Sequence, residues 1–157
     1  MPNIEIDNFK SATGGSGIDE ENEKDFAEGT NYIITIGIDT YKNPALKLKS
    51  CVNDCNALVK ILTEQYSFEA FEESLLNENA TKKGILDLLE RFRISKKLTT
   101  NDSLILYFSG HGHLFPLPGN EKIGCWVPQE AMDQQLKNLL KLPDVIDEIK
   151  QFYLILK

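Results

Sequence analysis

The strongest pattern along the chain is the run NYIITIGIDTY at residues 31–41, where apolar positions are continuous rather than alternating. Such a run predicts a strand buried on both faces, so we expect it near the centre of a parallel sheet. The stretch DSLILYFSG at 102–110 has the same character and predicts another apolar strand. A shorter strand is predicted within FEESLLNENA at 71–80, and KIGCWVPQEA at 122–131 predicts a short extended piece after a loop rich in Pro and Gly.

Helical periodicity separates these strands. The segment SCVNDCNALVKILTEQY at 50–66 repeats its apolar residues every three or four positions and predicts an amphipathic helix. Thr81 is suited to cap a second helix, and Pro143 opens a third at its first turn. The residues expected on the core side are Val52, Cys55, Leu58, Val59 and Leu62, then Ile85, Leu88, Leu89 and Phe92, and finally Val145, Ile146, Ile149, Phe152, Tyr153 and Leu156.

The alternation of strands and helices predicts an α/β fold. Right-handed crossovers place helices on both faces of a mainly parallel sheet, and ligands bind where such strands end. The sequence Ser-Gly-His-Gly at 109–112 follows an apolar strand at that edge. Glycines allow a sharp turn and close approach to a ligand, while the strand gives His111 a rigid support. This turn is therefore the first candidate functional site.

Composition narrows the classes of protein. With 157 residues, 41% of them hydrophobic, the chain has the size of one domain. Its formal charge of −7 and the lack of a basic cluster argue against nucleic acid and anionic membranes as partners. No apolar run reaches the roughly 18 residues of a membrane span. Three cysteines, an odd number, fit a reducing compartment, so we expect a cytoplasmic protein.

The first 30 residues differ from the rest. They contain Gly-Gly-Ser-Gly and the acidic cluster DEENEKD but few large apolar side chains. Such a segment cannot offset its ordering entropy by burial, so residues 1–30 are predicted to form a mobile acidic leader. The domain is expected to occupy residues 31–157.

Five segments resemble, in order and spacing, the N-terminal part of the caspase-like cysteine peptidase domain (peptidase C14 type). They are YIITIGIDTY, LKLKSCVNDCNALVKIL, LLNENATKKGIL, DSLILYFSGHGH and GCWVP, and the most specific is the strand followed by Ser-Gly-His-Gly. The closer relatives are metacaspases, paracaspases and bacterial caspase homologues. The resemblance implies a three-layer caspase-like fold and a cysteine-type endopeptidase that acts on peptide or protein substrates, without a cofactor or metal.

The resemblance also implies roles for three residues. His111 matches the histidine that activates a cysteine nucleophile and protonates the leaving amine, a role that suits an imidazole titrating near neutral pH. Gly112 would offer its N–H to the oxyanion, a contact worth on the order of 3 kcal/mol in the barrier. Asp54, in the VND motif, matches the acidic residue of the primary specificity pocket, where a buried carboxylate implies cleavage after Arg or Lys.

One expected residue is missing. In caspase-type enzymes the nucleophile follows the histidine by about 50 residues, which from His111 is roughly position 161. The resemblance places it in a strand ending in Asp-x-Cys-x-x-Gly. We therefore expect that the C-terminal strands of the fold are missing, that this chain alone is inactive, and that it needs the C-terminal part of the peptidase domain as a partner. The alternative is a catalytically inactive caspase-fold module for protein interaction.

Simpler interpretations of these residues stay open. His111 could be a structural turn histidine, His113 an exposed loop residue, and Asp54 a carboxylate that favours its helix N-terminus. The cysteines, Cys51, Cys55 and Cys125, fit small core residues better than a nucleophile. A zinc site could be imagined from Cys51, Cys55, His111 and His113, but neither of their spacings is typical of structural zinc.

Overall fold

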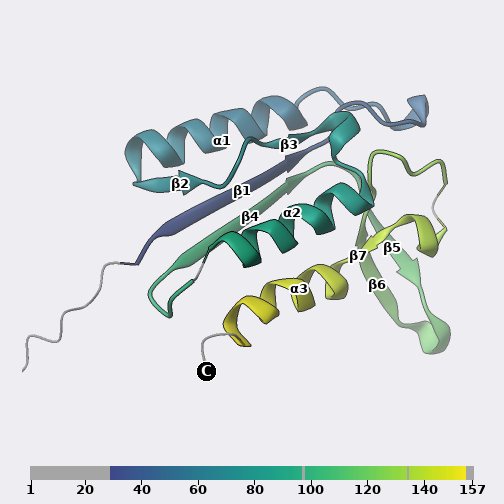
Figure 1. Ribbon diagram of the computed structural model, residues 1–157. Coiled ribbons are helices and arrows are strands. Elements are labelled where there is room, and N and C mark those ends of the chain that lie inside the picture. Colours follow the sequence, from purple (N-terminus) through teal and green to yellow (C-terminus); the bar gives the residue numbers. More distant parts are fainter. Residues whose placement is uncertain (1–28, 97, 134, 155–157) are drawn as a thin grey trace, which may run out of the picture.

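The computed structural model of the protein describes residues 29–96, 98–133 and 135–154 (Figure 1). The predicted leader, apart from its last two residues, lies outside the described residues. The elements are β1 (Asn31–Gly37), α1 (Cys51–Gln65), β2 (Phe68–Ala70), β3 (Leu75–Leu76), α2 (Lys82–Ser95), β4 (Ser103–Ser109), β5 (Gly112–Pro116), β6 (Lys122–Trp126), β7 (Leu140–Lys141) and α3 (Leu142–Leu154). None of the helices in this part of the chain is long and apolar enough to cross a membrane.

Strand β1 is the centre of a four-stranded parallel sheet. It pairs with β4 along its whole length on one side, from Asn31 opposite Ser103 to Gly37 opposite Ser109. On the other side it pairs first with β2 and then with β3. Every residue of β1 after Asn31 is buried, which confirms the central strand that the continuous apolar run predicts.

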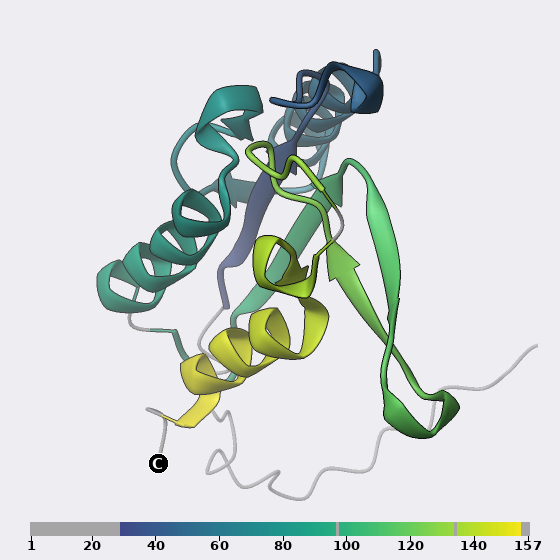
Figure 2. The same ribbon diagram turned by 90° about the vertical axis from the view of Figure 1, so that its right-hand side faces the viewer.

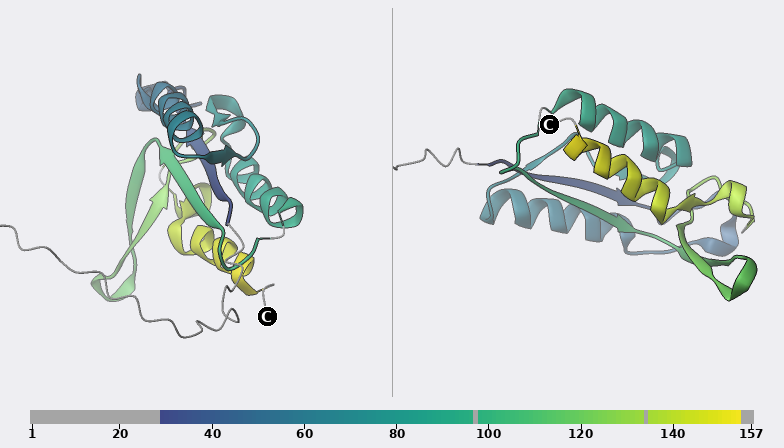
Figure 3. Two further views of the ribbon diagram at one scale, coloured as in Figure 1. Left: turned by 90° about the vertical axis from the view of Figure 1, so that its left-hand side faces the viewer. Right: turned by 90° about the horizontal axis from the view of Figure 1, so that it is seen from below.

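Helices cover both faces of this sheet, as predicted. Helix α1 lies over one face, and α2 and α3 lie side by side over the other (Figures 1 and 3). Because side chains alternate along a strand, Ile34 and Ile36 join the main core with α2 and α3, whereas Ile33 and Thr35 point to the α1 side. The layers are those of the expected three-layer α/β fold.

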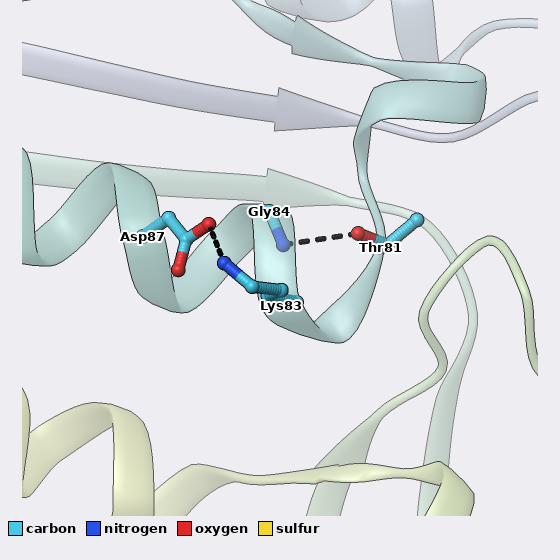
Figure 4. A network of polar contacts seen from close by, with 4 residues as sticks. All are labelled: Thr81, Lys83, Gly84 and Asp87. Carbon is cyan, nitrogen blue, oxygen red and sulfur yellow. Dashed lines mark hydrogen bonds and ion pairs between the residues drawn. The ribbon is translucent and has the colours of Figure 1, made fainter.

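Helix α2 begins as the sequence predicts. The Thr81 hydroxyl accepts a hydrogen bond from the Gly84 N–H at 2.9 Å, and Lys83 forms an ion pair with Asp87 one turn later (Figure 4). The predicted apolar stripe is fully buried, and its members are Ile85, Leu88, Leu89 and Phe92. A side-chain cap and a complete buried face together explain why the helix starts at this position.

The predicted faces of α1 and α3 are only partly correct. In α1 just Cys51 and Cys55 are fully buried. In α3, Val145 and Phe152 are buried as predicted. Ile146 is 47% exposed, so the side of the helix that carries it faces solvent. The side chain of Tyr153, and residue Leu156 altogether, lie outside the described part.

The loop predicted after β4 is instead a β-hairpin, so that prediction was wrong. Strand β5 pairs antiparallel with β6, and the chain reverses through Gly119 and Asn120, which have φ angles of 81° and 63°. The Pro and Gly residues mark this turn rather than the whole segment. The hairpin leaves the end of β4 and projects away from the main sheet (Figure 2). The FEESLLNENA strand is also reduced, to Leu75–Leu76, and β2 precedes it unpredicted.

Candidate functional site

His111 lies in the tight turn between β4 and β5, and three hydrogen bonds hold it. Its backbone N–H donates to the hydroxyl oxygen of Tyr41 at 2.8 Å, and its carbonyl oxygen accepts the Val127 N–H at 2.9 Å. The ring atom Nε2 lies 2.9 Å from the carbonyl oxygen of Leu46. The imidazole is half-buried, so the turn gives it a fixed position with access to solvent.

The contact with Leu46 determines which ring nitrogen of His111 carries hydrogen. A carbonyl oxygen can only accept a hydrogen bond, so Nε2 must donate its hydrogen to Leu46. In the neutral imidazole the other nitrogen, Nδ1, then carries a free lone pair. The geometry therefore makes Nδ1 the atom that can take up a proton.

Asp54 lies in the first turn of α1 and is exposed, not buried as expected for a pocket carboxylate.

The start of α1 is fixed by Asp39, whose two carboxylate oxygens accept the N–H groups of Cys51 and Val52 at 2.9 and 3.2 Å. These bonds satisfy two free donors of the helix N-terminus. The sequence analysis missed Asp39, although an Asp just after a buried strand is a signal that could have revealed it.

Asp54 and His111, the two candidate side chains, lie at the same edge of the sheet. Helix α1 starts directly over the end of β1, where a Cβ atom on Gly37 would lie 2.8 Å from the Cys55 sulfur. Because β1 and β4 are parallel and in register, the end of β4 that leads to His111 lies beside it. No hydrogen bond or ion pair between Asp54 and His111 is found among the described residues. The segment 38–50 links the start of α1 to the His111 turn. Its residue Asp39 binds the start of α1, and its residues Tyr41 and Leu46 bind His111.

Gly112 follows His111 as the first residue of β5 and lies opposite Trp126 of β6. The residue is exposed. A Cβ atom at this position would have the Cys125 carbonyl oxygen as its nearest neighbour, at 3.8 Å, an ordinary contact distance. Packing therefore does not require glycine here, and the space beside the Gly112 backbone is open to a ligand.

An apolar groove, which the sequence analysis did not foresee, opens beside this turn. It has a volume of about 340 Å³ and lies between the end of β4, the β5–β6 hairpin and the start of α3; its lining includes Phe108, Gly110, Gly112, Leu114, Trp126 and Leu142. The rings of Phe108 and Trp126 stack at 4.3 Å along one wall. Of the described strands only β1 pairs with β4, so the other edge of β4 is free, and Ile105 of β4 is 36% exposed.

Comparison with known proteins now identifies the family. The family model described as Peptidase_C14, caspase domain, matches residues 30–152. The chain belongs to this caspase domain family. Its fold is consistent with that of protein GSU0716 from Geobacter sulfurreducens, whose crystal structure matches with a TM-score of 0.56 at 20% identity, covering 78% of this chain and 44% of that one.

Several curated relatives of the caspase domain are metacaspases. Metacaspase-1 of Schizosaccharomyces pombe is 25% identical over 119 residues, which cover 71% of this chain and 27% of the relative. Metacaspase-1 of Kluyveromyces lactis is 30% identical over 61% of this chain and 23% of its own length, and metacaspase-2 of Arabidopsis thaliana is 33% identical over 54% and 21%. The chain thus spans about a quarter of the length of these relatives.

The three cysteines of the caspase domain are free thiols inside the core. Cys51, Cys55 and Cys125 are 8%, 0% and 2% exposed. Burial raises the pKa of Cys55 to about 12, helped by the nearby Cys51 and Asp54, and burial also raises the pKa of Cys125. A raised pKa keeps a thiol protonated, whereas a nucleophilic cysteine needs a lowered one.

His113 is not the exposed loop residue that the sequence suggested. It is half-buried within β5, directly opposite Cys125 of β6. The zinc site imagined from two cysteines and two histidines is not assembled in the described part of the chain, where no group of three or more His, Cys, Asp or Glu side chains is arranged to hold a metal ion.

Proposed function

We propose that this caspase domain is the histidine-bearing part of a cysteine-type endopeptidase, with His111 as its general base and acid. The observation that carries the proposal is the contact of His111 Nε2 with the Leu46 carbonyl oxygen, which leaves Nδ1 free to take the proton of a thiol. The Gly112 N–H, one residue further and beside open space, is suited to bind the oxyanion. Several similar proteins are named metacaspases, which supports a peptidase role.

The nucleophile of this peptidase comes from a segment outside these 157 residues. The burial of all three thiols, and the raised pKa values of Cys55 and Cys125, support that part of the proposal. The free edge of β4 and the apolar groove beside His111 offer such a segment a place to pair as a further strand. The partner is then the C-terminal part of the peptidase domain, and the chain alone has no peptidase activity.

Asp54 gives the peptidase a preference for Arg or Lys before the cleaved bond. Its carboxylate is exposed at the edge of the sheet that also holds His111, so a cationic substrate side chain can reach it.

We also propose a cytoplasmic location for the protein, which its three unpaired thiols support.

The test compares the 157-residue chain with the same chain extended at its C-terminus by the C-terminal part of a caspase domain, the part that carries the nucleophile. Both are incubated with fluorogenic peptides that carry Arg, Lys or Asp before the reporter group. We expect no cleavage by the chain alone and cleavage after Arg and Lys by the extended protein. His111→Ala should lower kcat of the extended protein by about 100-fold or more, the contribution of general acid–base catalysis.

Two carboxylate variants of the extended protein test the specificity. Asp54→Asn should raise KM for Arg and Lys peptides, whereas Glu64→Gln, an exposed carboxylate near the other end of α1, should leave it unchanged. An equal loss for all peptides would contradict the role of Asp54. Cleavage by the chain alone would show that the nucleophile lies within it, and an extended protein that folds without cleaving any peptide would favour the interaction module instead.

A further inference from the structure

The hydroxyl group of Tyr41 contacts the turn that carries His111. Tyr41 is 4% exposed and lies in the segment that follows β1. Its oxygen accepts the backbone N–H of His111 at 2.8 Å, across 70 residues of sequence. The two rings also lie close together, with centroids 5.2 Å apart and planes tilted by 54°. Tyr41 therefore contacts both the backbone and the ring of the candidate catalytic residue.

Gly110 makes room for this contact. A Cβ atom at position 110 would lie 2.8 Å from the Tyr41 hydroxyl oxygen and 2.9 Å from the ring of Phe108. Any side chain here would push the tyrosine away from His111. The first glycine of the Ser-Gly-His-Gly motif thus serves the approach of Tyr41 to the turn.

The segment that carries Tyr41 is itself held in place. The Lys42 N–H donates to the Gln129 carbonyl oxygen at 2.9 Å, and the Leu48 N–H donates to the Asp39 carbonyl oxygen at 2.9 Å. Leu46, whose carbonyl oxygen binds the His111 ring, lies in the same segment. One braced segment therefore fixes the backbone of His111 through Tyr41 and its imidazole through Leu46.

We propose that Tyr41 is a positioning residue for His111, whose phenolic oxygen fixes the histidine backbone so that the ring stays on the Leu46 carbonyl with Nδ1 free. The catalytic meaning of this role rests on the proposed peptidase function, but the contact itself does not. Burial raises the pKa of Tyr41 to about 12, so the phenol stays neutral and protonated at physiological pH. A neutral acceptor orients the turn without adding charge beside the imidazole.

The test follows His111 by NMR in the 157-residue chain, without any peptidase assay. Tyr41→Phe removes only the accepting oxygen, and Tyr32→Phe is the matched control because Tyr32 is also buried, at 9% exposure, but lies at the other end of β1. We expect Tyr41→Phe to speed hydrogen exchange of the His111 amide by about tenfold, which corresponds to about 1.4 kcal/mol, and to shift the ring ¹⁵N resonances. Tyr32→Phe should change neither signal.

A second replacement covers the case in which Tyr41→Phe does not fold. Incorporation of 3-fluorotyrosine at position 41 keeps the shape and the oxygen but weakens it as an acceptor, so the His111 amide proton should shift in the direction of weaker hydrogen bonding. Unchanged amide and ring signals in either Tyr41 replacement would overturn the proposal. If these signals change while the extended protein cleaves no peptide, the positioning role stands and the peptidase proposal fails.

Discussion

The Nε2 atom of His111 lies 2.9 Å from the carbonyl oxygen of Leu46, a residue 65 positions earlier in the chain. The contact joins the turn after β4 to the segment after β1, two connections that meet at the carboxyl edge of the parallel sheet. Side chains on such connections can be brought together by a rigid sheet even when they are far apart in sequence. The proposed role of His111 depends on this contact between the two connections.

The first prediction concerns the tautomer of His111. Because a carbonyl oxygen cannot donate, the neutral ring should carry its hydrogen on Nε2. Long-range ¹H–¹⁵N spectra of the chain with both imidazoles neutral should show a protonated Nε2 and an unprotonated Nδ1 for His111. His111→Ala identifies the resonances, since the remaining ring signals then belong to His113. A neutral ring protonated at Nδ1 would contradict the geometry.

The second prediction concerns Asp39 and the stability of α1. Asp39→Ala removes the acceptor of two N–H groups at the helix start, so the free energy of unfolding should fall by about 1–2 kcal/mol, the upper part of the range for loss of a helix cap. Urea unfolding monitored by circular dichroism measures this change. Asp54→Ala, in the same turn, loses only the favourable dipole interaction, about 0.3–1 kcal/mol. Equal effects of the two variants would contradict the cap.

The third prediction concerns alkaline pH. Burial raises the pKa of Cys55 from 9.0 to about 12 and that of Tyr41 from 10.0 to about 12. At a pH between the ordinary pKa of each group and its raised pKa in the folded chain, the unfolded chain has lost a proton that the folded chain keeps. The free energy of unfolding should therefore fall as pH rises from about 9 towards 12. It should be insensitive to these two groups below pH 9.

Two variants isolate the thiol contribution. Urea unfolding at several pH values between about 8 and 10 should show a smaller decrease for Cys55→Ala than for the unaltered chain, because the titrating thiol is gone. Tyr66→Phe, which changes a tyrosine that is 60% exposed, should keep the full decrease. A Cys55→Ala slope equal to that of the unaltered chain would show that the buried thiol does not titrate as described.

Strands β1 and β4 and helix α2 could be predicted from the sequence because local patterns determine them. Continuous apolar runs are enough to predict the two strands, and the Thr81 cap with the apolar stripe that follows it is enough to predict α2. The hairpin after β4 could not be recognised in this way, because β5 is short and its turn depends on a positive φ at Asn120 as well as at Gly119. Short β2 and β3 exist because they pair with β1, which is a tertiary effect.

The candidate site shows the same division. The motif around His111 singles out the histidine itself, but its partners Tyr41 and Leu46 lie 70 and 65 residues away and are specified by the fold. Asp54 could be assigned only through family resemblance, and its exposure depends on how α1 is turned over the sheet. The groove is formed by the end of β4, the β5–β6 hairpin and the start of α3, so no local pattern marks it.

The fourth prediction contrasts two glycines. A Cβ atom on Gly37 would lie 2.8 Å from the Cys55 sulfur and 2.9 Å from the Cys51 carbonyl oxygen, so Gly37→Ala should lower the free energy of unfolding by about 1–3 kcal/mol. At Gly112 the nearest atom would be 3.8 Å away, so Gly112→Ala should change stability by less than about 0.5 kcal/mol. Urea unfolding of both variants checks this difference, and a similar loss in both would contradict the packing at β1.

The fifth prediction uses the tolerance of Gly112 to separate folding from catalysis. In the extended protein, the methyl group of Gly112→Ala would lie in the open space where the proposed oxyanion site would receive a substrate carbonyl. Displacing that carbonyl by even a fraction of an ångström should lower kcat by roughly 10-fold to 100-fold. Peptide cleavage and urea unfolding, measured on the same preparation, should therefore show a lowered kcat but an almost unchanged free energy of unfolding for this variant. Full activity would remove Gly112 from the oxyanion site, because a substrate bound there could not ignore the added methyl group.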